Sequence, residues 1–433
     1  MASINAKNKL LSPTKETGNK MDIRRVFFIK IAAVILILGL LLQGCASSKL
    51  QHDDNEQGNQ QEKVKQPGTD SEDLPDNLTQ PLDVHDNEQN TGSPDGADDQ
   101  TENGKDESEG AQDGSGDGAQ DKNGTPEPID LSVVKPNEAG RIMVVMFHNF
   151  IEKYEKGDKD YTTTFDAFRE LLSTLYDSDY RLISLNDYLN GNIDTPAGCI
   201  PMVFTFDDGT SGQFSLIEEN GELKVNPDSA VGIIEEFNRT HPDFGVEGTF
   251  FVNLGNQTFG KTGTLEQRLE YLTSKGFEIG NHTYSHINLK TEAKTAEIIQ
   301  NEIGGNQKRM YELIPGYTFV TFSLPYGAPS KDLMQYVIKG EYDGTAYENK
   351  AIMEVGWDPA QSPFTAKFDP LATHRVRSSG IKPVDMDLAW WLENMKRSNE
   401  YVSDGDPNTV TVPESYEDLI DQEKLGGRKL VVY

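Results

Sequence analysis

The sequence predicts one α/β domain built on a parallel sheet or barrel, preceded by a long segment without a core. Two observations predict the domain: strand-like runs alternate with helix-like runs beyond residue 140, and roughly 300 residues are available, enough for one large α/β domain. A third observation sets its boundary. Residues 46–135 contain almost no aromatic or large aliphatic side chains, so they cannot bury enough apolar surface to offset the entropy of an ordered chain. We therefore expect a disordered acidic linker over 46–135 and a folded domain over 136–433.

Each element of the domain is predicted from its local residue pattern. Short apolar runs rich in β-branched and aromatic residues indicate strands. We expect strands at 142–147, 181–184, 201–206, 248–253, 277–280, 319–324, 351–355, near His374 and at 429–432. Apolar residues three and four positions apart indicate helices. We expect helices at 164–176, 230–237, 265–274, 293–313, 331–338 and 384–395. In parallel βα units the chemistry gathers at the carboxyl ends of the strands.

The N-terminus predicts an export and anchoring signal over residues 1–45. Basic residues precede the unbroken apolar run 31–42, which has the length of a signal peptide. The alternative is a marginal membrane-spanning helix over 26–42. Leu42-Gln43-Gly44-Cys45 resembles a bacterial lipobox, which implies a lipid-modified Cys45. Both interpretations place the domain at the extracellular face of a bacterial membrane on a tether. Met21 is an alternative start of the chain.

Charge and cysteine content narrow the classes of partner. The formal net charge is −31, and both the linker and the folded part are acidic. Because no basic stripe occurs, we expect no nucleic-acid partner, and a neutral or cationic partner fits better. An acidic linker of about 90 residues would let a tethered domain sweep the cell wall. The remaining cysteine, Cys199, is expected to be a small buried residue rather than a disulfide partner of Cys45.

Two aspartates at the end of a predicted buried strand indicate a bound cation. Asp207 and Asp208 follow the apolar run 201–206, and paired carboxylates there are costly unless a positive group meets them. His282 and His286 lie four residues apart, a spacing that brings both imidazoles to one face of a helical turn. Two imidazoles and one carboxylate make an open site for a divalent metal ion. Because neighbouring strand residues point to opposite faces, both aspartates can serve one site only if the chain bends, which Gly209 permits.

These residues resemble the motifs of a known family. Thr205–Gly209 together with His282–His286 are similar to the first two motifs of the polysaccharide deacetylases, carbohydrate esterase family 4 with its NodB homology domain, and Phe322–Gly327 is similar to the third. The similarity spans roughly residues 140–400. It implies a distorted (β/α) barrel and a hydrolase that removes acetyl groups from a polysaccharide. Candidate substrates are peptidoglycan, poly-N-acetylglucosamine, a chitin-like polymer and acetylated xylan.

The resemblance also implies roles for individual residues. Asp208, His282 and His286 would bind one divalent ion, with zinc expected and cobalt, nickel or manganese as alternatives. Asp207 would be the general base, and the backbone N–H of Tyr326 would stabilise the oxyanion.

A late histidine would act as general acid. Leu371-Ala372-Thr373-His374 matches the family's late pattern, which nominates His374, and Trp357 and Asp358 would form the fourth motif, lining the acetyl pocket and tuning that histidine. Alternatives stay open, since His374 could be an ordinary loop residue and Trp357 a core residue.

The third motif departs from the family at Ser323, where relatives carry an arginine that orients the base. Serine cannot clamp a carboxylate in bidentate fashion, so we expect Arg375 or Arg377 to substitute. His148, at the end of the first strand, is expected to have a structural or substrate-contact role rather than to be a ligand. Asn253 either lines the groove or caps a loop.

Two other functions compete with a deacetylase. A carbohydrate-binding surface lipoprotein with little or no activity would fit the loss of the arginine at position 323. A glycosidase would need two carboxylates placed across a sugar ring, which adjacent aspartates do not provide.

Overall fold

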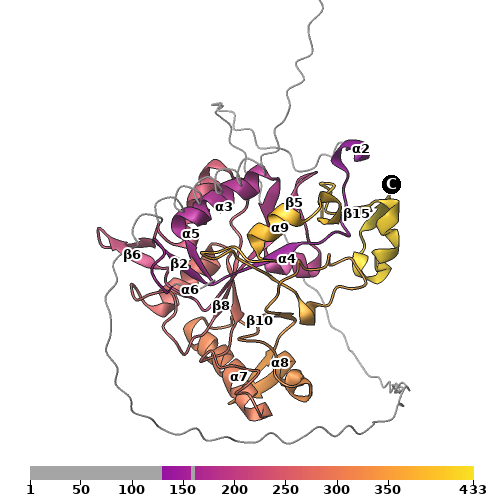
Figure 1. Ribbon diagram of the computed structural model, residues 1–433. Coiled ribbons are helices and arrows are strands. Elements are labelled where there is room, and N and C mark those ends of the chain that lie inside the picture. Colours follow the sequence, from indigo (N-terminus) through magenta and orange to yellow (C-terminus); the bar gives the residue numbers. More distant parts are fainter. Residues whose placement is uncertain (1–128, 158–160) are drawn as a thin grey trace, which may run out of the picture. The chain divides into compact units, whose positions relative to one another are not determined.

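The computed structural model describes residues 129–157 and 161–433 (Figure 1). The predicted export signal and most of the predicted linker lie outside these ranges. Within the linker as predicted, the described part carries a helical turn, α2 (Leu131–Val134). None of the described helices combines the length and apolar character that crossing a bilayer requires.

The centre of the domain is an eight-stranded sheet in which every pairing is parallel, which confirms the predicted α/β class. In order across the sheet its strands are β13 (Ala351–Met353), β10 (Thr321–Ser323), β9 (Glu278–Asn281), β8 (Thr249–Val252), β5 (Ile200–Asp207), β1 (Met143–Phe147) and β14 (Val376–Arg377). The eighth, β4 (Tyr180–Leu182), pairs with the start of β5. Helices and loops surround these strands (Figure 1).

Most of the helices begin after a capping side chain. The helices are α3 (Phe165–Asp177), α4 (Leu185–Asn190), α5 (Ala230–Thr240), α6 (Leu265–Ser274), α7 (Ala296–Leu313), α8 (Met334–Ile338) and α9 (Leu388–Asn394). The oxygen of a serine or threonine side chain accepts a backbone N–H at the start of α3 to α7, which satisfies a donor that the helix leaves free. Short 3-10 turns occupy Lys331–Leu333, Pro370–Ala372, Arg397–Asn399, Glu414–Leu419 and Gln422–Leu425.

One segment, residues 373–378, joins the two edges of the sheet into a distorted barrel. Thr373 N donates to Ile352 O of β13 (2.9 Å), and Glu354 N donates to Thr373 O (2.9 Å). Three residues later β14 pairs with β1, and Ser378 N donates to Met146 O (3.0 Å). The segment therefore closes the sheet, and alternate side chains along it point into the barrel or away from it.

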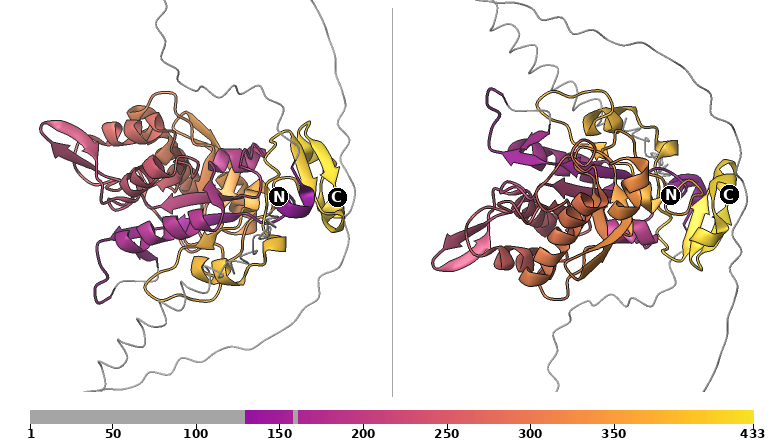
Figure 2. Two further views of the ribbon diagram at one scale, coloured as in Figure 1. Left: turned by 90° about the horizontal axis from the view of Figure 1, so that it is seen from above. Right: turned by 90° about the horizontal axis from the view of Figure 1, so that it is seen from below.

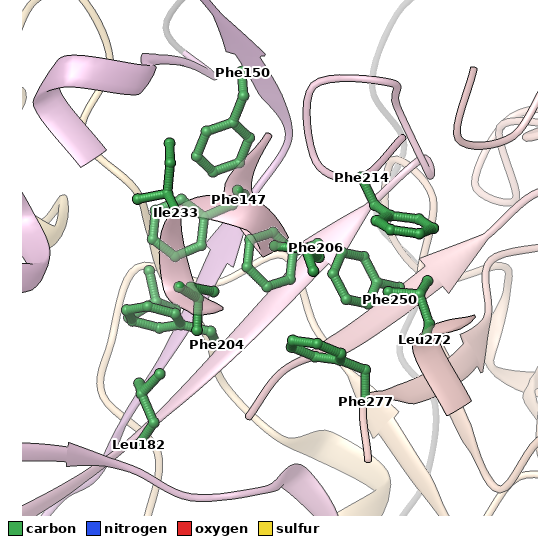
Figure 3. Close-up of a cluster of buried hydrophobic side chains, with 14 of the residues drawn as sticks. Phe147, Phe150, Leu182, Phe204, Phe206, Phe214, Ile233, Phe250, Leu272 and Phe277 are labelled. Atoms are coloured by element: carbon green, nitrogen blue, oxygen red, sulfur yellow. The ribbon is translucent and has the colours of Figure 1, made fainter. Parts of the chain in front are cut away.

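The main core is aromatic (Figure 3). All eight residues of β5 are buried, as expected for a central parallel strand covered on both faces. The ring of Phe206 stacks on Phe147 at 5.4 Å and on Phe250 at 4.6 Å between centroids, so β1, β5 and β8 are held together by one stack. This packing fixes the strand ends that carry the site, because close-packed rings leave little room for the strands to shift.

The structure adds elements that the sequence patterns did not predict, and all lie outside the central sheet. They are β2 (Asn149–Ile151) with β3 (Thr162–Thr164), β6 (Leu216–Glu219) with β7 (Glu222–Val225), β11 (Lys339–Tyr342) with β12 (Thr345–Glu348), and β15 (Thr409–Val412), which pairs with β16 (Lys429–Val432). The predicted terminal strand is confirmed as β16, but it pairs with β15 rather than with the barrel. Figure 2 places this pair and the β6–β7 hairpin at opposite ends of the domain.

Candidate active site

The adjacent aspartates diverge because the chain turns between them. Asp207 is the last residue of β5 and is 2% exposed. Asp208 has a φ of +81° and Gly209 a φ of +64°, so the strand ends in a left-handed bend. A Cβ on Gly209 would lie 2.7 Å from Cγ2 of Thr258, which leaves space only for glycine. The two carboxylates consequently have different partners.

Asp207 is clamped by Arg375. Nη1 of Arg375 donates to Oδ1 of Asp207 (2.7 Å) and Nη2 donates to Oδ2 (2.8 Å), with both side chains buried. The hydroxyl of Ser323 also donates to Oδ2 (3.0 Å), and it accepts a hydrogen bond from Nη2 of Arg375 (2.8 Å). Burial by itself raises the pKa of Asp207, but the charge of Arg375 and of the nearby imidazoles outweighs it and lowers the pKa to about 2.

Arg375 is itself held from two further directions. Its Nε donates to the backbone oxygen of Glu354 (3.0 Å), and its Nη1 donates to the hydroxyl of Thr205 (3.2 Å). Of the two arginines that the sequence nominated in place of the family arginine, Arg375 therefore makes the contact. The guanidinium carbon of Arg377 instead lies 5.0 Å from the centre of the Tyr161 ring.

Asp208 faces both histidines of the H-x3-H pattern. Its Oδ1 lies 3.5 Å from Nε2 of His282 and 3.1 Å from Nε2 of His286, and one ligand atom from each of the three residues lies within 4.8 Å of the others. Burial opposes ionisation of Asp208, but the two adjacent imidazoles hold its pKa well below the usual range. These three residues form the metal-ligand group, a set of donors that can hold a metal ion.

The group fits a divalent cation by two tests. Oδ1 of Asp208 is buried and has no hydrogen-bond partner among the described residues. Burying an unpaired carboxylate oxygen costs free energy, which a bound cation would offset. Nδ1 of His282 lies 2.8 Å from the backbone oxygen of Ser323, and as the donor it leaves the lone pair of Nε2 facing Asp208. Metal-binding histidines are commonly fixed in this way.

The two histidines approach each other through a loop, which corrects the expected helical turn. Residues 282–286 after β9 are not helical, and both Thr283 (φ +68°) and His286 (φ +62°) have left-handed backbone conformations. The ring centroids of His282 and His286 end 4.9 Å apart. Such conformations are unfavourable for residues with a Cβ, and they are often found at functional sites.

Asn253 stabilises this loop. Its Nδ2 donates to the backbone oxygens of His282 and Thr283 (3.0 Å to the latter), and the side chain is buried. Of the two roles left open for Asn253 by the sequence, the structure favours the loop-capping one.

Tyr326 covers one side of the group. Its ring lies 4.9 Å from that of His286, it is 62% exposed, and its φ is +57°. Within the described ranges its backbone N–H has no hydrogen-bond acceptor, so this donor is available to a bound molecule.

His148 is close to the paired carboxylates, whereas His374 has other neighbours. His148 follows β1, its Nδ1 is buried without a partner among the described residues, and its ring contacts that of Tyr161 at 4.8 Å. Burial lowers the pKa of His148, although Asp207 and Asp208 oppose this shift. The nitrogens of His374 lie 3.5 Å from a carboxylate oxygen of Glu354 and 3.6 Å from one of Asp358.

His374 is therefore not brought to the metal-ligand group by any contact that we find in the described residues. It precedes Arg375 on the closing segment, and neighbours on an extended chain point to opposite faces. Since Arg375 points into the barrel, His374 points away from it. Trp357 is 64% exposed, so the core-packing alternative for it is wrong.

Sequence reasoning missed Tyr161 and the hydroxyl contacts of Ser323. Tyr161 precedes β3, an element that the residue pattern did not reveal. The replacement arginine was expected to be Arg375 or Arg377, but the hydrogen bonds that Ser323 makes to both Asp207 and Arg375 depend on how distant segments meet.

Comparison with known proteins supports the family indicated by the motifs. A polysaccharide deacetylase family model matches residues 194–344, a range that ends before Arg375. No curated protein matches the chain. Among solved structures, the Streptococcus pyogenes deacetylase PplD in complex with acetate is 15% identical, with coverage of 60% of this chain and 96% of that one and a TM-score of 0.42.

Two further solved structures are similar at the same level. A polysaccharide deacetylase from Bacillus cereus is 16% identical, with coverage of 59% and 69% and a TM-score of 0.43. IcaB from Ammonifex degensii is 16% identical, with coverage of 59% and 97% and a TM-score of 0.42. Residues 194–344 thus match the polysaccharide deacetylase family model, which describes a class of hydrolases that remove acetyl groups.

Proposed function

We propose that this protein is a metal-dependent deacetylase that removes N-linked acetyl groups from a polysaccharide of the cell wall or cell surface. One observation carries the proposal: the metal-ligand group of Asp208, His282 and His286 lies directly beside Asp207, which Arg375 holds in bidentate contact. A metal group and an oriented carboxylate side by side are what metal-assisted hydrolysis requires.

The metal-ligand group would hold one divalent ion, with zinc expected because two imidazoles and one carboxylate leave an open coordination position. Cobalt, nickel and manganese are the alternatives. When bound, such an ion polarises the acetyl carbonyl and lowers the pKa of a water molecule.

Asp207 is the general base in this proposal. The two prongs of Arg375 and the hydroxyl of Ser323 fix its orientation. Oδ2 accepts from both Arg375 and Ser323, whereas Oδ1 accepts only from Nη1 of Arg375 and keeps a lone pair free to accept a proton. The free backbone N–H of Tyr326 is the proposed donor to the negatively charged oxygen that develops from the carbonyl.

The leaving nitrogen needs a proton, which we assign to a histidine. His374 is the residue nominated by sequence, and its ring lies beside Asp358, the residue expected to tune it, and beside Glu354. We therefore keep His374 for this role. His148, which follows strand β1 and has a buried Nδ1 without a partner among the described residues, is the alternative.

The substrate and location are inferred from the sequence. A chain anchored through lipidated Cys45, or through an N-terminal helix, would meet peptidoglycan or poly-N-acetylglucosamine before any other acetylated polymer, while chitin-like polymers and xylan are further candidates. An inactive binding lipoprotein was suggested by Ser323. The contact of Arg375 with Asp207 removes the reason for that suggestion.

Acetate release tests the proposal. The purified chain is loaded with zinc and incubated with N-acetylglucosamine oligomers, peptidoglycan and acetylated xylan, with and without a chelator. We expect acetate from at least one amino-sugar substrate and none after chelation. Release of no acetate from any substrate by metal-loaded protein would contradict the proposal.

A further inference from the structure

Arg377, in β14, lies on the same face of segment 373–378 as Arg375 and has no hydrogen-bond or ion-pair partner among the described residues. The two residues are two positions apart on an extended strand, so their side chains point to the same side. Arg377 lies nearer the carboxyl end of the strand, the end at which the site is built. Across 129–157 and 161–433 its guanidinium makes no hydrogen bond or ion pair, whereas every other arginine of these ranges makes at least one.

Contacts between side chains connect Arg377 to the active site. The guanidinium carbon lies 5.0 Å from the centre of the Tyr161 ring, and that ring lies 4.8 Å from the ring of His148. His148 in turn experiences the charges of Asp207 and Asp208. Arg377 is half-buried, so packing restricts its position. A positive charge without an ion-pair partner among the described residues therefore lies two ring contacts from His148, the residue that follows β1 beside β5.

The chemistry of this pair suits a carboxylate. A guanidinium presents planar, paired N–H donors that match the two oxygens of a carboxylate, and the Tyr161 ring offers a flat apolar surface beside it. The chain carries 71 acidic residues against 40 basic ones, yet none of the described acidic side chains pairs with Arg377. A bound molecule is then the natural source of the missing negative charge.

We propose that Arg377 and Tyr161 form a carboxylate subsite, so that the preferred substrate is an acetylated amino-sugar polymer that carries an acidic group near the acetamido group. This inference rests on the proposed deacetylase function and specifies its substrate class. The carboxylate could belong to the lactyl ether of a muramic acid unit or to a neighbouring uronic acid.

Binding to metal-free protein tests the subsite separately from catalysis. The full chain is stripped with a chelator and titrated calorimetrically with four tetrasaccharides. The first is an N-acetylglucosamine tetramer, and the second alternates N-acetylglucosamine with N-acetylmuramic acid. The third is the second ligand with its carboxylates reduced to alcohols, and the fourth alternates N-acetylglucosamine with a uronic acid. We expect the protein to bind at least one carboxylated ligand about 10- to 100-fold more tightly than the reduced ligand. The carboxylated tetrasaccharide that binds more tightly shows whether a muramic acid unit or a uronic acid supplies the carboxylate.

Two variants distinguish binding of the ligand carboxylate by Arg377 from packing of the Arg377 side chain against the Tyr161 ring. Arg377→Met keeps the length and packing of the side chain without its charge, and we expect it to abolish the preference for carboxylates while binding to the neutral tetramer stays unchanged. Arg377→Lys should retain part of the preference, because it keeps the charge but loses the fork. Equal wild-type affinity for carboxylated and reduced ligands overturns the inference, as does an equal loss on all ligands in Arg377→Met.

Acetate release from the neutral tetramer by zinc-loaded wild-type protein is measured in parallel. If acetate is released but carboxylates are not preferred, only the subsite is wrong. If no ligand releases acetate, the proposed function fails even where the binding preference holds.

Discussion

Arg375 and Asp207 form a buried two-pronged ion pair that joins the closing segment 373–378 to the end of β5. The distances are 2.7 Å from Nη1 to Oδ1 and 2.8 Å from Nη2 to Oδ2, and Arg375 is fully buried. The pair therefore connects closure of the barrel with the orientation of the proposed base.

Removal of this arginine should affect both activity and stability. Arg375→Ala leaves a buried carboxylate without its cation, which typically costs about 3–5 kcal/mol of folding free energy. We expect the midpoint of thermal unfolding to fall and kcat for acetate release to drop by about 100-fold or more. Arg377→Ala is the matched control, and on a neutral substrate it should keep both values near wild type. Wild-type turnover in Arg375→Ala would show that the base needs no guanidinium.

Restoring the family arginine at position 323 should not help this protein. Ser323 is fully buried against Asp207 and Arg375, so the larger side chain of Ser323→Arg would compete with Arg375 for the same space. We expect the single variant to be less stable and less active than wild type. The double variant Ser323→Arg/Arg375→Ala should recover activity relative to Arg375→Ala alone. Thermal melts and acetate assays on the wild type, the two single variants and the double variant measure how strongly the two substitutions depend on each other. If their effects simply add, the two arginines do not compete for one place beside Asp207.

Metal removal should reveal the metal-ligand group. Treatment with a chelator is expected to abolish acetate release and to lower the unfolding midpoint, because a ligand bound only by the folded state stabilises it. Asp208→Ala and His282→Ala should each lower the zinc content measured by atomic emission. Asn253→Ala is informative as a loop control, since it should weaken zinc binding less than loss of a ligand does. Full zinc occupancy in Asp208→Ala would exclude this group as the site.

Glu138 should make stability depend on pH. Burial, with the nearby charge of Asp404, raises the pKa of Glu138 from 4.5 to about 8 in the folded protein. The folded state then holds a proton that the unfolded state releases between pH 4.5 and 8. The contribution of Glu138 is therefore fully present below pH 4.5 and is lost as pH rises to 8, at about 1.4 kcal/mol per pH unit within that window.

The neutral variant Glu138→Gln tests this dependence. Unfolding midpoints of wild type and variant are compared from pH 5 to 8.5, and we expect the wild type to lose stability relative to the variant as pH rises. Parallel curves would mean that Glu138 does not titrate within this range.

Gly209 should tolerate no side chain. Gly209→Ala adds a Cβ that would lie 2.7 Å from Thr258 Cγ2, on a residue whose φ of +64° already disfavours it. We expect a loss of at least about 1 kcal/mol in folding free energy and a larger loss of activity, because the bend separates Asp207 from Asp208. Gly221 also has a positive φ (+82°), but a Cβ there would meet no atom within 4 Å. The difference between Gly209→Ala and Gly221→Ala therefore measures the cost of the steric clash at Gly209.

Local patterns in the sequence determined most of the barrel and the identity of its metal-ligand group. Strands such as β5 and helices such as α3 are specified by nearest neighbours, namely apolar periodicity and a hydroxyl cap, so their positions agreed with the expectation to within a few residues. Likewise, Asp208, His282 and His286 could be recognised because their chemistry is written in two short motifs.

Only the tertiary structure decided which arginine meets Asp207 and which way His374 points. Asp207 and Arg375 are 168 residues apart, and no local pattern encodes a pairing that depends on where segment 373–378 closes the sheet. The alternation of side chains on that segment directs Arg375 inward and His374 outward, and a shift of one residue in its register would exchange them. That register is set by hydrogen bonds to two different strands, which form only when the whole barrel has assembled.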